Sequence, residues 1–373
     1  MKISVDRKFF SEQLGLVSKA ISPQTTIPAL TGIYLQVQPD RLILTGSDSD
    51  MSIQSTILPG ELNQLVIEEP GEIIVEARYL NEIMKNMDCV TVVLETQDAT
   101  QLTILTDNGK YTLNGYVEDQ YPPVDFSRPT AGFTMDTEQL KKAVDQTRFA
   151  CSDKDPRPVL GGVHFLADGE TLRCSATDSY RLADKTMNFA SDNPFDITIP
   201  ARTLTEITRL PQNDLEKLEV YADRKRVQFI YDKTIIQSKL LEGAFPDVSR
   251  IIPSRFKAQL VINKEALRRA VDRVSFIRNE KQFVIKMSLS PEEVRLITTS
   301  QEIGESTEKL TGHTYTGEPL ELTINGTYLS QAIRALDGEN IVLRFSGNLS
   351  PLLITAQDDE QTRMVLVPIR SHY

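Results

Sequence analysis

Residues 28–32 read Pro-Ala-Leu-Thr-Gly and residues 158–162 read Pro-Val-Leu-Gly-Gly, so this short motif occurs twice in the chain. The same offset relates three further pairs: Asp6 and Asp136, Phe10 and Leu140, and Asp48 and Asp178. One constant spacing over about forty residues is typical of an internal repeat. A third copy begins near Leu260. We therefore expect the function to depend on a surface that the copies form together.

The composition is that of an ordinary globular protein with more than one domain. The chain has 373 residues, of which 40% are hydrophobic and 25% are charged, and a single core does not usually grow to this length. The repeat predicts three domains, at residues 1–127, 128–253 and 254–373. The formal net charge of −11 argues against binding nucleic acid over the whole surface. It still allows a basic face on an otherwise acidic exterior.

Each copy has the same predicted order of elements. It opens with an amphipathic helix, preceded by a residue whose side-chain oxygen can cap the first backbone amides. These caps are Asp6, Asp136 and Asn263. A hairpin follows, with short apolar runs around a polar turn, at residues 33–37 and 42–45, 163–166 and 172–175, and 286–289 and 294–298. A second helix and a closing strand pair complete the copy, which predicts an α+β fold of three tandem copies, each with two helices on antiparallel sheet.

The second helices carry basic residues opposite their apolar stripes. Five residues beyond the first leucine of each stripe stand Lys85, Arg209 and Arg334, on the predicted solvent face. Such residues are common on any exposed helix, but their recurrence in an acidic chain favours one positive surface for sequence-independent contact with DNA phosphates. The predicted DNA contacts are Arg78, Lys85, Lys141, Lys142, Arg148, Lys154, Arg202, Arg209, Arg268, Arg269 and Arg334.

The sequence contains no recognisable catalytic or cofactor motif. It lacks the glycine-rich phosphate loops and the HExxH metal motif, and its three histidines are isolated. Asp48 and Asp50 resemble a metal loop only in part, and a turn or strand-end role explains them better. The three cysteines lack ligand spacing, so we expect reduced thiols in a cytoplasmic protein without cofactor or metal. The charged N-terminus is unlike a signal peptide.

Three stretches are more specific than the repeat and stand in register with it. Residues 176–182 read Ala-Thr-Asp-Ser-Tyr-Arg-Leu, residues 245–247 read Phe-Pro-Asp, and residues 365–370 read Val-Leu-Val-Pro-Ile-Arg. With them, essentially the whole chain resembles the bacterial sliding clamps, the beta subunits of DNA polymerase III. The resemblance implies a head-to-tail homodimer that closes into a ring, with the helices facing the hole. The dimer contact that it implies joins two pairs of residues, Tyr111 and Leu113 against Phe276 and Ile277.

The resemblance also implies a pocket between the second and third copies. Clamps use it to bind short peptides of the polymerase, the clamp loader and other replication and repair proteins, and its walls are aliphatic with a polar margin. The implied residues are Arg157, Leu160, Thr177, Tyr180, Arg181, Leu182, Pro246, Ile251, Asn325, Tyr328, Leu349, Val365, Val367, Pro368, Ile369 and Arg370. Val367 and Ile369 stand where clamps can have methionine, which would stiffen the pocket. Residues 371–373 extend beyond Arg370 and could affect access.

We therefore expect a DNA sliding clamp, a non-enzymatic processivity factor that encircles duplex DNA and tethers the polymerase, with no membrane contact. Scattered cations without an aromatic stacking platform would bind DNA weakly and without regard to sequence. Two alternatives stay open. One is a magnesium-dependent enzyme of nucleic-acid metabolism that uses Asp48, Asp50 or Asp178. The other is a multi-domain peptide-binding scaffold that does not encircle DNA.

Overall fold

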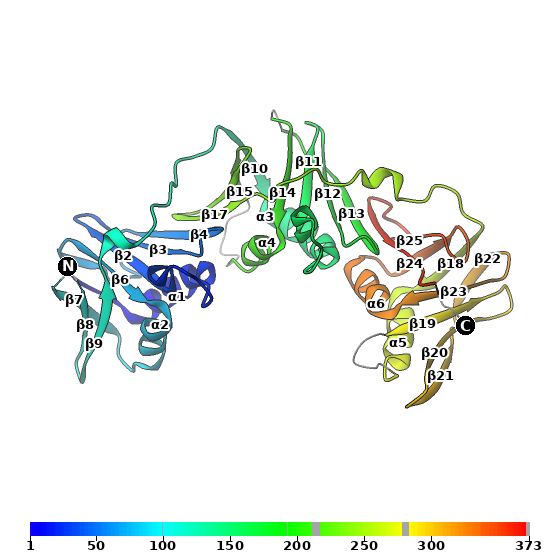
Figure 1. The fold of residues 1–373 in the computed structure, drawn as a ribbon, viewed down its shortest axis with the longest axis horizontal. Helices are drawn as coiled ribbons and strands as arrows, with labels where there is room; N and C mark the ends of the chain where they lie inside the picture. The colour runs from blue at the N-terminus through cyan, green and yellow to red at the C-terminus, as the bar shows by residue number, and fades with distance from the viewer. Residues whose placement is uncertain (99, 192, 211–216, 278–282, 371–373) are drawn as a thin grey trace. The chain divides into compact units, whose positions relative to one another are not determined.

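The computed structural model describes residues 1–98, 100–191, 193–210, 217–277 and 283–370. Helices and antiparallel strands recur along the chain in three similar rounds (Figure 1), which confirms the predicted α+β class. The chain forms two compact units, Met1–Thr137 with Arg209–Leu240 and Glu138–Thr208 with Leu241–Tyr373. Among the described residues, no helix is long and apolar enough to cross a membrane.

The first unit contains one antiparallel sheet of 13 strands. Its strands are β1 (Lys2–Asp6), β2 (Gly32–Gln38), β3 (Arg41–Ser47), β4 (Met51–Ile57), β5 (Val66–Glu69), β6 (Gly71–Glu76), β7 (Thr91–Asp98), β8 (Gln101–Thr106), β9 (Gly109–Tyr116), β10 (Ala131–Asp136), β15 (Lys217–Ala222), β16 (Arg226–Tyr231) and β17 (Thr234–Lys239). Their order in the sheet is β10-β15-β16-β17-β4-β3-β2-β6-β9-β8-β7-β1-β5. Helices α1 (Arg7–Val17) and α2 (Ala77–Asn86) pack against each other and cover this sheet (Figure 1).

Helix α1 forms for the reasons that its sequence predicts. The Asp6 carboxylate accepts a hydrogen bond from the Phe9 amide at 2.8 Å, which satisfies one of the free donors at the helix N-terminus. Phe10, Leu14 and Val17, which form its apolar stripe, are fully buried. Burying a side chain of this size contributes about 1.5–3 kcal/mol, whereas a cap contributes about 1 kcal/mol. The stripe therefore fixes the helix on the sheet, and the cap sets where it begins.

The second unit contains one sheet of nine strands and one of four. Its strands are β11 (Gly162–Ala167), β12 (Thr171–Thr177), β13 (Arg181–Asn188), β14 (Phe195–Pro200), β18 (Ala258–Asn263), β19 (Val284–Leu289), β20 (Val294–Ser300), β21 (Gly304–Lys309), β22 (His313–Gly317), β23 (Leu320–Asn325), β24 (Asn340–Phe345), β25 (Leu352–Ala356) and β26 (Thr362–Leu366). The sheet orders are β14-β11-β12-β13-β26-β25-β24-β18-β22 and β21-β20-β19-β23.

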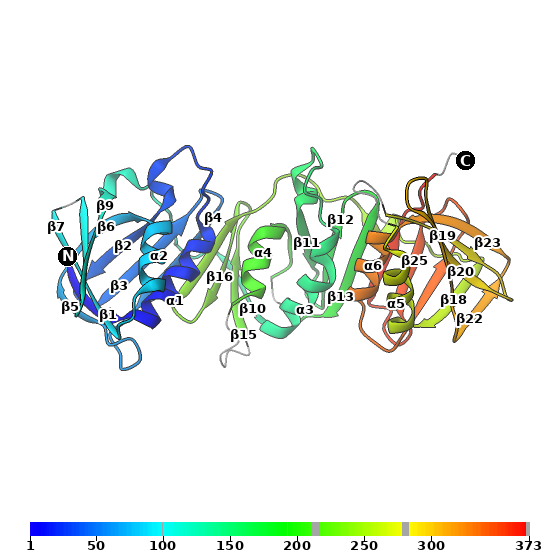
Figure 2. The ribbon, with the colours of Figure 1, turned by 90° about the horizontal axis from the view of Figure 1, so that it is seen from below.

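Four helices belong to the second unit: α3 (Thr137–Thr147), α4 (Ala201–Thr208), α5 (Lys264–Val274) and α6 (Gly326–Ala335). Figures 1 and 2 show α3, α4 and α6 on one face of the nine-stranded sheet, with α5 packed beside α6. The Asn263 side chain caps α5 by accepting from the Ala266 amide at 3.0 Å. The three predicted hairpins are confirmed as β2–β3, β11–β12 and β19–β20.

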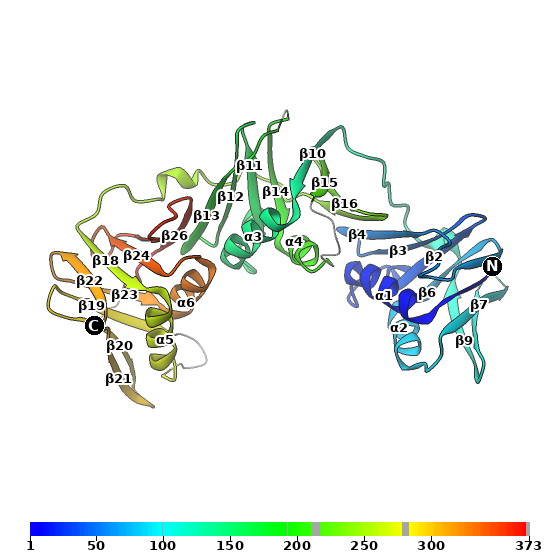
Figure 3. The same cartoon turned by 180° about the vertical axis from the view of Figure 1, so that it is seen from behind.

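Two strand ladders join consecutive copies of the repeat. In the first junction, β17 of copy two pairs with β4 of copy one, inside the first unit. In the second junction, β13 of copy two pairs with β26 of copy three, inside the second unit (Figure 3). Because these ladders cross from one copy to the next, the two compact units do not coincide with the three predicted domains. The boundaries near residues 127 and 253 stay a prediction.

Candidate functional site

The basic residues predicted on the second helices are exposed. Lys85 lies near the end of α2, Arg334 near the end of α6, and Arg209 directly after α4. Arg78 and Arg202, near the starts of α2 and α4, are exposed as well. In the second unit, these side chains belong to helices on one face of the nine-stranded sheet (Figure 2). The helix pattern therefore located solvent-facing cations correctly, and their contact with DNA stays a prediction.

Several of the predicted DNA contacts have acidic neighbours in the second unit. Lys142 pairs with Asp337 at 2.6 Å, and Arg268 pairs with Asp272 at 2.6 Å. Three more contacts complete this set: Arg268 to Glu265 at 2.8 Å, Arg269 to Glu265 at 3.8 Å and Arg334 to Asp272 at 3.4 Å. Exposed ion pairs contribute at most about 1 kcal/mol, so a phosphate can replace the carboxylate. Lys141 and Arg148 are only partly exposed.

A pocket of about 410 Å³ collects four of the predicted residues. Lys154, Tyr180, Arg181 and Tyr328 line it together with the segment Cys151–Pro156 and Asp178. Lys154 and Tyr180 are exposed, so both can meet a partner. Burial raises the pKa of the Cys151 thiol to about 12, which keeps this thiol protonated and unreactive at neutral pH. The pocket is therefore suited to binding rather than to covalent chemistry.

Arg181 forms the floor of this pocket and is held from three sides. Its guanidinium pairs with Asp178 at 3.0 Å, stacks on the Tyr328 ring at 4.2 Å from the centroid and donates to the Gln331 side-chain oxygen. A guanidinium so surrounded is rigid, because its planar donors are already oriented. The sequence did not indicate the contact with Gln331, which comes from α6 and lies far away in the chain.

Two of the three aspartates that could suggest a metal site form turns instead. Asp48 accepts hydrogen bonds from the Asp50 and Met51 amides, and Asp178 accepts from the Tyr180 and Arg181 amides. In each turn the residue after the aspartate has a positive φ, 78° at Ser49 and 76° at Ser179. In the part of the chain that the structure describes, no group of three His, Cys, Asp or Glu side chains is arranged to hold a metal.

A buried apolar cluster covers the second junction and is called the apolar cluster here. Leu182 of β13, Val365 of β26 and Leu353 of β25 are cross-strand neighbours, and Val248 packs on them, with Phe245 and Ile252 at the side. Leu182 and Val365 are predicted pocket residues. We did not predict Leu353 or Val248 from the sequence. An apolar residue in a strand, or after a proline-containing segment, looks like any other core residue.

The C-terminal segment continues the second junction beyond β26. The Val367 amide donates to the Tyr180 carbonyl at 2.9 Å, and the Ile369 amide donates to the Thr323 carbonyl at 2.7 Å. Val367 and Ile369 are partly exposed, whereas Pro368 is buried. This alternation leaves two aliphatic side chains at the surface beside Tyr180. Residues 371–373, for which we predicted an effect on access, lie outside the described residues.

The other predicted pocket residues divide into four groups. Leu160 and Thr177 are buried, so they support the pocket from beneath. Asn325 caps α6 by accepting from the Thr327 and Tyr328 amides, and Arg157 binds Asp155 and Ser179; their polar groups therefore have structural partners. Pro246 is half-buried. Three residues are exposed: Ile251, Leu349 and Arg370.

The first junction has polar residues where the second has the apolar cluster. In its ladder, Ser52 of β4, Gln237 of β17 and Gln228 of β16 take the places of Leu182, Val365 and Leu353. Above them runs the segment after Tyr121, which corresponds to the segment after Phe245. Segments from equivalent places in the repeat therefore cover both junctions. The side chains beneath them are polar in the first junction and apolar in the second.

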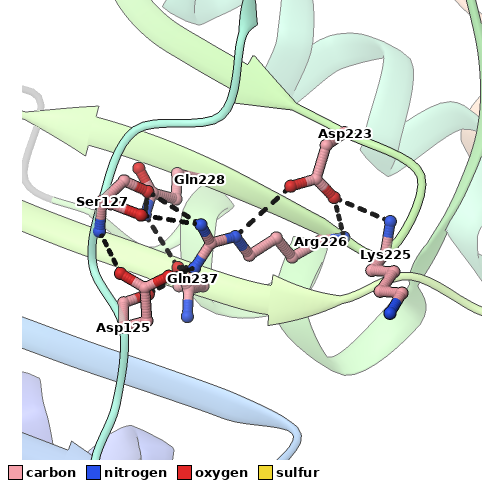
Figure 4. A network of polar contacts seen from close by, with 7 residues as sticks. All are labelled: Asp125, Ser127, Asp223, Lys225, Arg226, Gln228 and Gln237. Carbon is pink, nitrogen blue, oxygen red and sulfur yellow. Dashed lines mark hydrogen bonds and ion pairs between the residues drawn. The ribbon is translucent and has the colours of Figure 1, made fainter.

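A hydrogen-bond network fastens that segment to the first junction (Figure 4). Arg226 donates to the Ser127 carbonyl at 3.1 Å and hydroxyl at 3.0 Å, and it pairs with Asp125 at 3.1 Å and Asp223 at 3.4 Å. The Gln228 amide donates to the Ser127 carbonyl at 3.0 Å and to Gln237 at 2.7 Å. The chain's own segment thus occupies the polar surface of this junction.

The predicted dimer residues differ in how much surface they offer. Phe276 is 63% exposed, and Tyr111 is also exposed, as a contact surface requires. The Ile277 side chain is only 4% exposed and packs in the interior of the single chain, and its part in a dimer contact stays a prediction. Along β9, only residues 115 and 116 pair with β6, which leaves the edge before them unpaired among the described strands. Strand β21 likewise pairs on one side, with β20.

The family comparison covers the chain in three consecutive parts. The N-terminal domain of the DNA polymerase III beta subunit matches residues 1–125, the central domain residues 134–247 and the C-terminal domain residues 249–370. Among characterised relatives, a beta sliding clamp of Bacillus subtilis strain 168 is 32% identical over 378 residues, and the match covers 100% of both chains. A beta sliding clamp of Staphylococcus epidermidis RP62A is 33% identical over 377 residues, again over 100% of both.

Solved structures agree with these matches. The crystal structure of a DNA polymerase sliding clamp from Bacillus subtilis superposes with a TM-score of 0.95 at 32% identity, over 100% of both chains. That of a DNA polymerase III beta chain from Streptococcus pneumoniae TIGR4 superposes with a TM-score of 0.94 at 28% identity, over 99% of this chain and 100% of that chain.

Proposed function

Because this chain belongs to the family of bacterial beta sliding clamps, the beta subunits of DNA polymerase III, we propose that it encircles duplex DNA and tethers the replicative polymerase. The observation that carries the proposal is the match over the full length of other clamps, since a ring needs every domain. It acts without a cofactor, in the cytoplasm, as a processivity factor rather than an enzyme.

The exposed helix cations supply the contact with DNA. A duplex presents about one phosphate charge per 1.7 Å of its axis, and cations that neutralise phosphates release counterions without reading the sequence. Lys85, Arg78 and Arg202 are exposed at helix ends, where they can move from one phosphate to the next. Contacts of this kind are weak one by one, so the protein slides while ring closure keeps it on the DNA.

Ring closure uses the unpaired strand edges. The edge of β9 that precedes Gly115 and the edge of β21 each present free backbone groups, and unpaired edges readily accept a strand from another chain. A head-to-tail dimer pairs β9 of one chain with β21 of the next, and two such contacts close the ring. Tyr111 and Phe276 contribute exposed aromatic surface beside these edges.

The peptide site is the Tyr180 pocket with the surface beside it. The partly exposed aliphatic side chains of Val367 and Ile369 suit apolar side chains of a partner, and the buried Leu182 and Val365 support this surface from beneath. Tyr180 and Arg181 supply polar groups that fix the direction of the peptide. Polymerase, clamp loader and repair proteins would share this site and compete for it.

Loading on circular DNA tests the encircling function. With clamp loader and ATP, we expect the protein to co-elute with nicked circular plasmid in gel filtration at moderate salt and to leave it when the plasmid is linearised. A peptide-binding scaffold would not load in either case. Retention on linear DNA equal to that on the circle would contradict topological binding.

The salt dependence of duplex binding tests the helix cations. The logarithm of the DNA-binding constant falls linearly with the logarithm of the salt concentration, and each phosphate contact adds about 0.9 to the steepness of that line. We therefore expect Lys85→Gln to make the line less steep by about 0.9. The matched control is Lys239→Gln, an exposed lysine of β17 that pairs with Asp50 at 3.1 Å. Equal slopes in both variants would show that α2 does not contact DNA.

The magnesium-enzyme alternative has a direct test. Asp178→Asn removes the carboxylate that this alternative needs, and we expect no metal-dependent cleavage of duplex or single-stranded DNA in either the parent protein or the variant. Cleavage that the substitution abolishes would favour the enzyme.

A deletion tests the peptide site. Removing residues 367–373 should abolish polymerase stimulation and leave the dimer mass unchanged in ultracentrifugation, and stimulation that survives the deletion would contradict the peptide site.

A further inference from the structure

A cavity of about 520 Å³ lies on the face of the nine-stranded sheet that points away from α6. Arg181 of β13 contacts Tyr328 and Gln331 of α6, and successive side chains of a strand point to opposite faces. Asp184, three residues further along β13, therefore faces away from α6. Three arginines of different strands line the cavity on this face, Arg173 of β12, Arg344 of β24 and Arg363 of β26. We call it the arginine pocket.

The register of the sheet brings the polar groups of this pocket together. Asp184 is the cross-strand partner of Ser175 on one side and of Arg363 on the other, and Arg363 is also the partner of Thr355. Side chains of cross-strand partners share one face of a sheet, so these four residues form a polar row. Backbone pairing therefore fixes their positions, without help from a loop.

A buried carboxylate orients two of the arginines. Asp184 has no exposed side-chain surface, and it accepts hydrogen bonds from Ser175 at 2.6 Å, Arg173 at 2.6 Å and Arg363 at 2.7 Å. A buried charge requires such partners. These contacts use only some of the N–H donors of the two guanidinium groups, so both arginines are held in place and can still donate to a ligand.

The third arginine pairs with a carboxylate that lies in solvent. Arg344 donates to Glu360 at 2.6 Å and to the Thr355 hydroxyl at 3.2 Å. The Glu360 side chain is 71% exposed. An ion pair with so exposed a partner contributes at most about 1 kcal/mol, so Arg344 can exchange Glu360 for an anion in the cavity.

The charge balance of the arginine pocket is positive by one. Two carboxylates, Asp184 and Glu360, form ion pairs with its three arginines. Asp247 also interacts electrostatically with Arg173, but it pairs with Arg250 at 3.0 Å, and this pair adds no net charge. The excess is local, because the whole chain carries a net charge of −11.

The strand ladder itself does not require these charges. In the first junction, Gln54 stands at the place of Asp184, and Ile235 and Ile43 stand at the places of the two arginines that Asp184 binds. Both junctions form the same ladder. A buried ion cluster is rarely more stabilising than apolar residues of similar size, so a ligand that uses the charges explains them better than the stability of the sheet does.

The remaining wall of the pocket is apolar. Ile252, Pro253 and Phe256 line it, and Phe256 is exposed. The volume lies within the range of about 300–1,000 Å³ that is typical of small-molecule sites, and it exceeds what one inorganic ion fills. An apolar wall opposite a few charged donors suits an organic anion with an apolar body.

We propose that the arginine pocket binds a small carboxylic acid from solution, with the carboxylate on the arginines and the apolar body against Ile252 and Phe256. A planar carboxylate matches guanidinium donors in a bidentate arrangement, and its single charge equals the excess positive charge. A phosphate dianion fits less well, since Asp184 and Glu360 repel its second charge. The proposal does not depend on binding of DNA or of partner peptides.

Two ring compounds of nearly equal shape test the charge of the ligand. These are para-fluorobenzoate and its neutral twin para-fluorobenzamide, titrated into the full-length protein at neutral pH and followed by fluorine NMR. We expect the benzoate to bind about tenfold more tightly than the benzamide, as a charge-assisted hydrogen bond provides. Equal affinities, or no binding of the benzoate at millimolar concentration, would overturn the proposal.

Competition separates the carboxylate from other anions. Unlabelled benzoate should displace para-fluorobenzoate, and acetate should do so less effectively, because it lacks an apolar body. Inorganic phosphate at the same concentration should also displace less than benzoate does. Phosphate that competes better than benzoate would contradict a site built for a planar carboxylate.

A variant identifies the source of the charge preference. Arg344→Gln removes the excess charge, so the benzoate and the benzamide should then bind equally. Arg295→Gln is the matched control, since Arg295 is a strand arginine of the same unit that also pairs with one glutamate, Glu293, at 2.9 Å. The preference should survive in this control. If Arg344→Gln instead weakens both compounds equally, Arg344 acts only on the structure of the pocket and the proposal is wrong.

A second variant tests the apolar wall without removing a core side chain. Phe256 is exposed, so Phe256→Ala should fold like the parent protein, which its melting temperature checks. We expect this variant to bind para-fluorobenzoate more weakly and acetate as the parent does. An unchanged affinity for para-fluorobenzoate would contradict the placement of the apolar body.

Discussion

The two junctions between copies share a backbone ladder and differ in the side chains above it. The second junction has Leu182, Val365 and Leu353 in cross-strand contact, whereas the first has Ser52, Gln237 and Gln228 at the same places. The chain covers the polar set itself, through Ser127 and Asp125 (Figure 4). The chain covers the apolar set as well, through Val248, so both ladders are closed by chain segments of the same origin.

The difference decides what holds the covering segment on each junction. Polar residues in the first junction are stable only if their hydrogen bonds are satisfied, and the chain segment after Tyr121 supplies the acceptors. Apolar residues in the second junction need no such partner, and packing against Val248 leaves Leu182 and Val365 only 2% and 1% exposed. Three side chains in each ladder therefore set whether the cover is held by hydrogen bonds or by apolar packing.

Making the second junction resemble the first should have the largest effect. Leu353→Gln with Val365→Gln introduces the residues of the first junction, and we expect the free energy of unfolding to fall by about 3–6 kcal/mol, because two buried apolar side chains that contribute about 1.5–3 kcal/mol each are lost. Urea denaturation measures it. Leu166→Gln, at a leucine that is 40% exposed in β11, is the control, and a loss of stability no larger than in this control would contradict a stabilising apolar cluster at the second junction.

Breaking the seam of the first junction should have an intermediate effect. Arg226→Ala leaves Asp125, Asp223 and the Ser127 carbonyl without their charged donor, so we expect the free energy of unfolding to fall by about 1–3 kcal/mol in urea denaturation. Peptide affinity should not change. Lys225→Ala is the control, since only the backbone amide of Lys225 takes part in the network. Equal stability of the two variants would mean that the side chain of Arg226 does not hold the segment.

The smallest effect concerns the aromatic pair at the start of each covering segment. Tyr34 lies against Tyr121 with centroids 5.2 Å apart, and His164 stacks on Phe245 at 4.6 Å. Burial lowers the pKa of His164, against the opposing effect of Asp196, and Arg173 lowers it further. The unfolded chain therefore binds the proton more tightly, and this residue makes the fold less stable as pH falls below about 6.5.

His164→Tyr places the residue of the first junction in the second and removes that titration. We expect the melting temperature of the variant to decrease less than that of the parent protein between pH 7.5 and pH 5.5. Differential scanning calorimetry at both pH values measures the difference. Parallel decreases would mean that His164 does not contribute to acid sensitivity.

The sequence predicted elements and exposed faces well, because both follow from local patterns. The stripe of Phe10, Leu14 and Val17 and the cap at Asp6 are read from neighbours in the chain. The ladders that join the copies bring together residues that are distant in sequence, such as Asp50 and Lys239, and no local pattern records their register. The contrast between Leu353 and Gln228 has meaning only once that register is known.

The site was predicted in part for the same reason. Tyr180, Arg181 and Leu182 form one motif, so the resemblance identified them together. Ile277 was assigned to the dimer surface beside Phe276, but adjacent residues at a helix end face different environments, and only Phe276 is exposed. Gln331 and Leu353 belong to elements whose patterns describe an ordinary helix and strand.

The pairing of β17 with β4 has a consequence for a nicked chain. A protease that cuts after Pro123 severs the covalent link between copies one and two, yet the ladder from Thr234 to Ser238 and the ion pair of Lys239 with Asp50 still bind the two fragments. The fragments should therefore migrate as one particle under native conditions and separate only in denaturant. An intact backbone is not required at this point, because the paired strands hold the two fragments together.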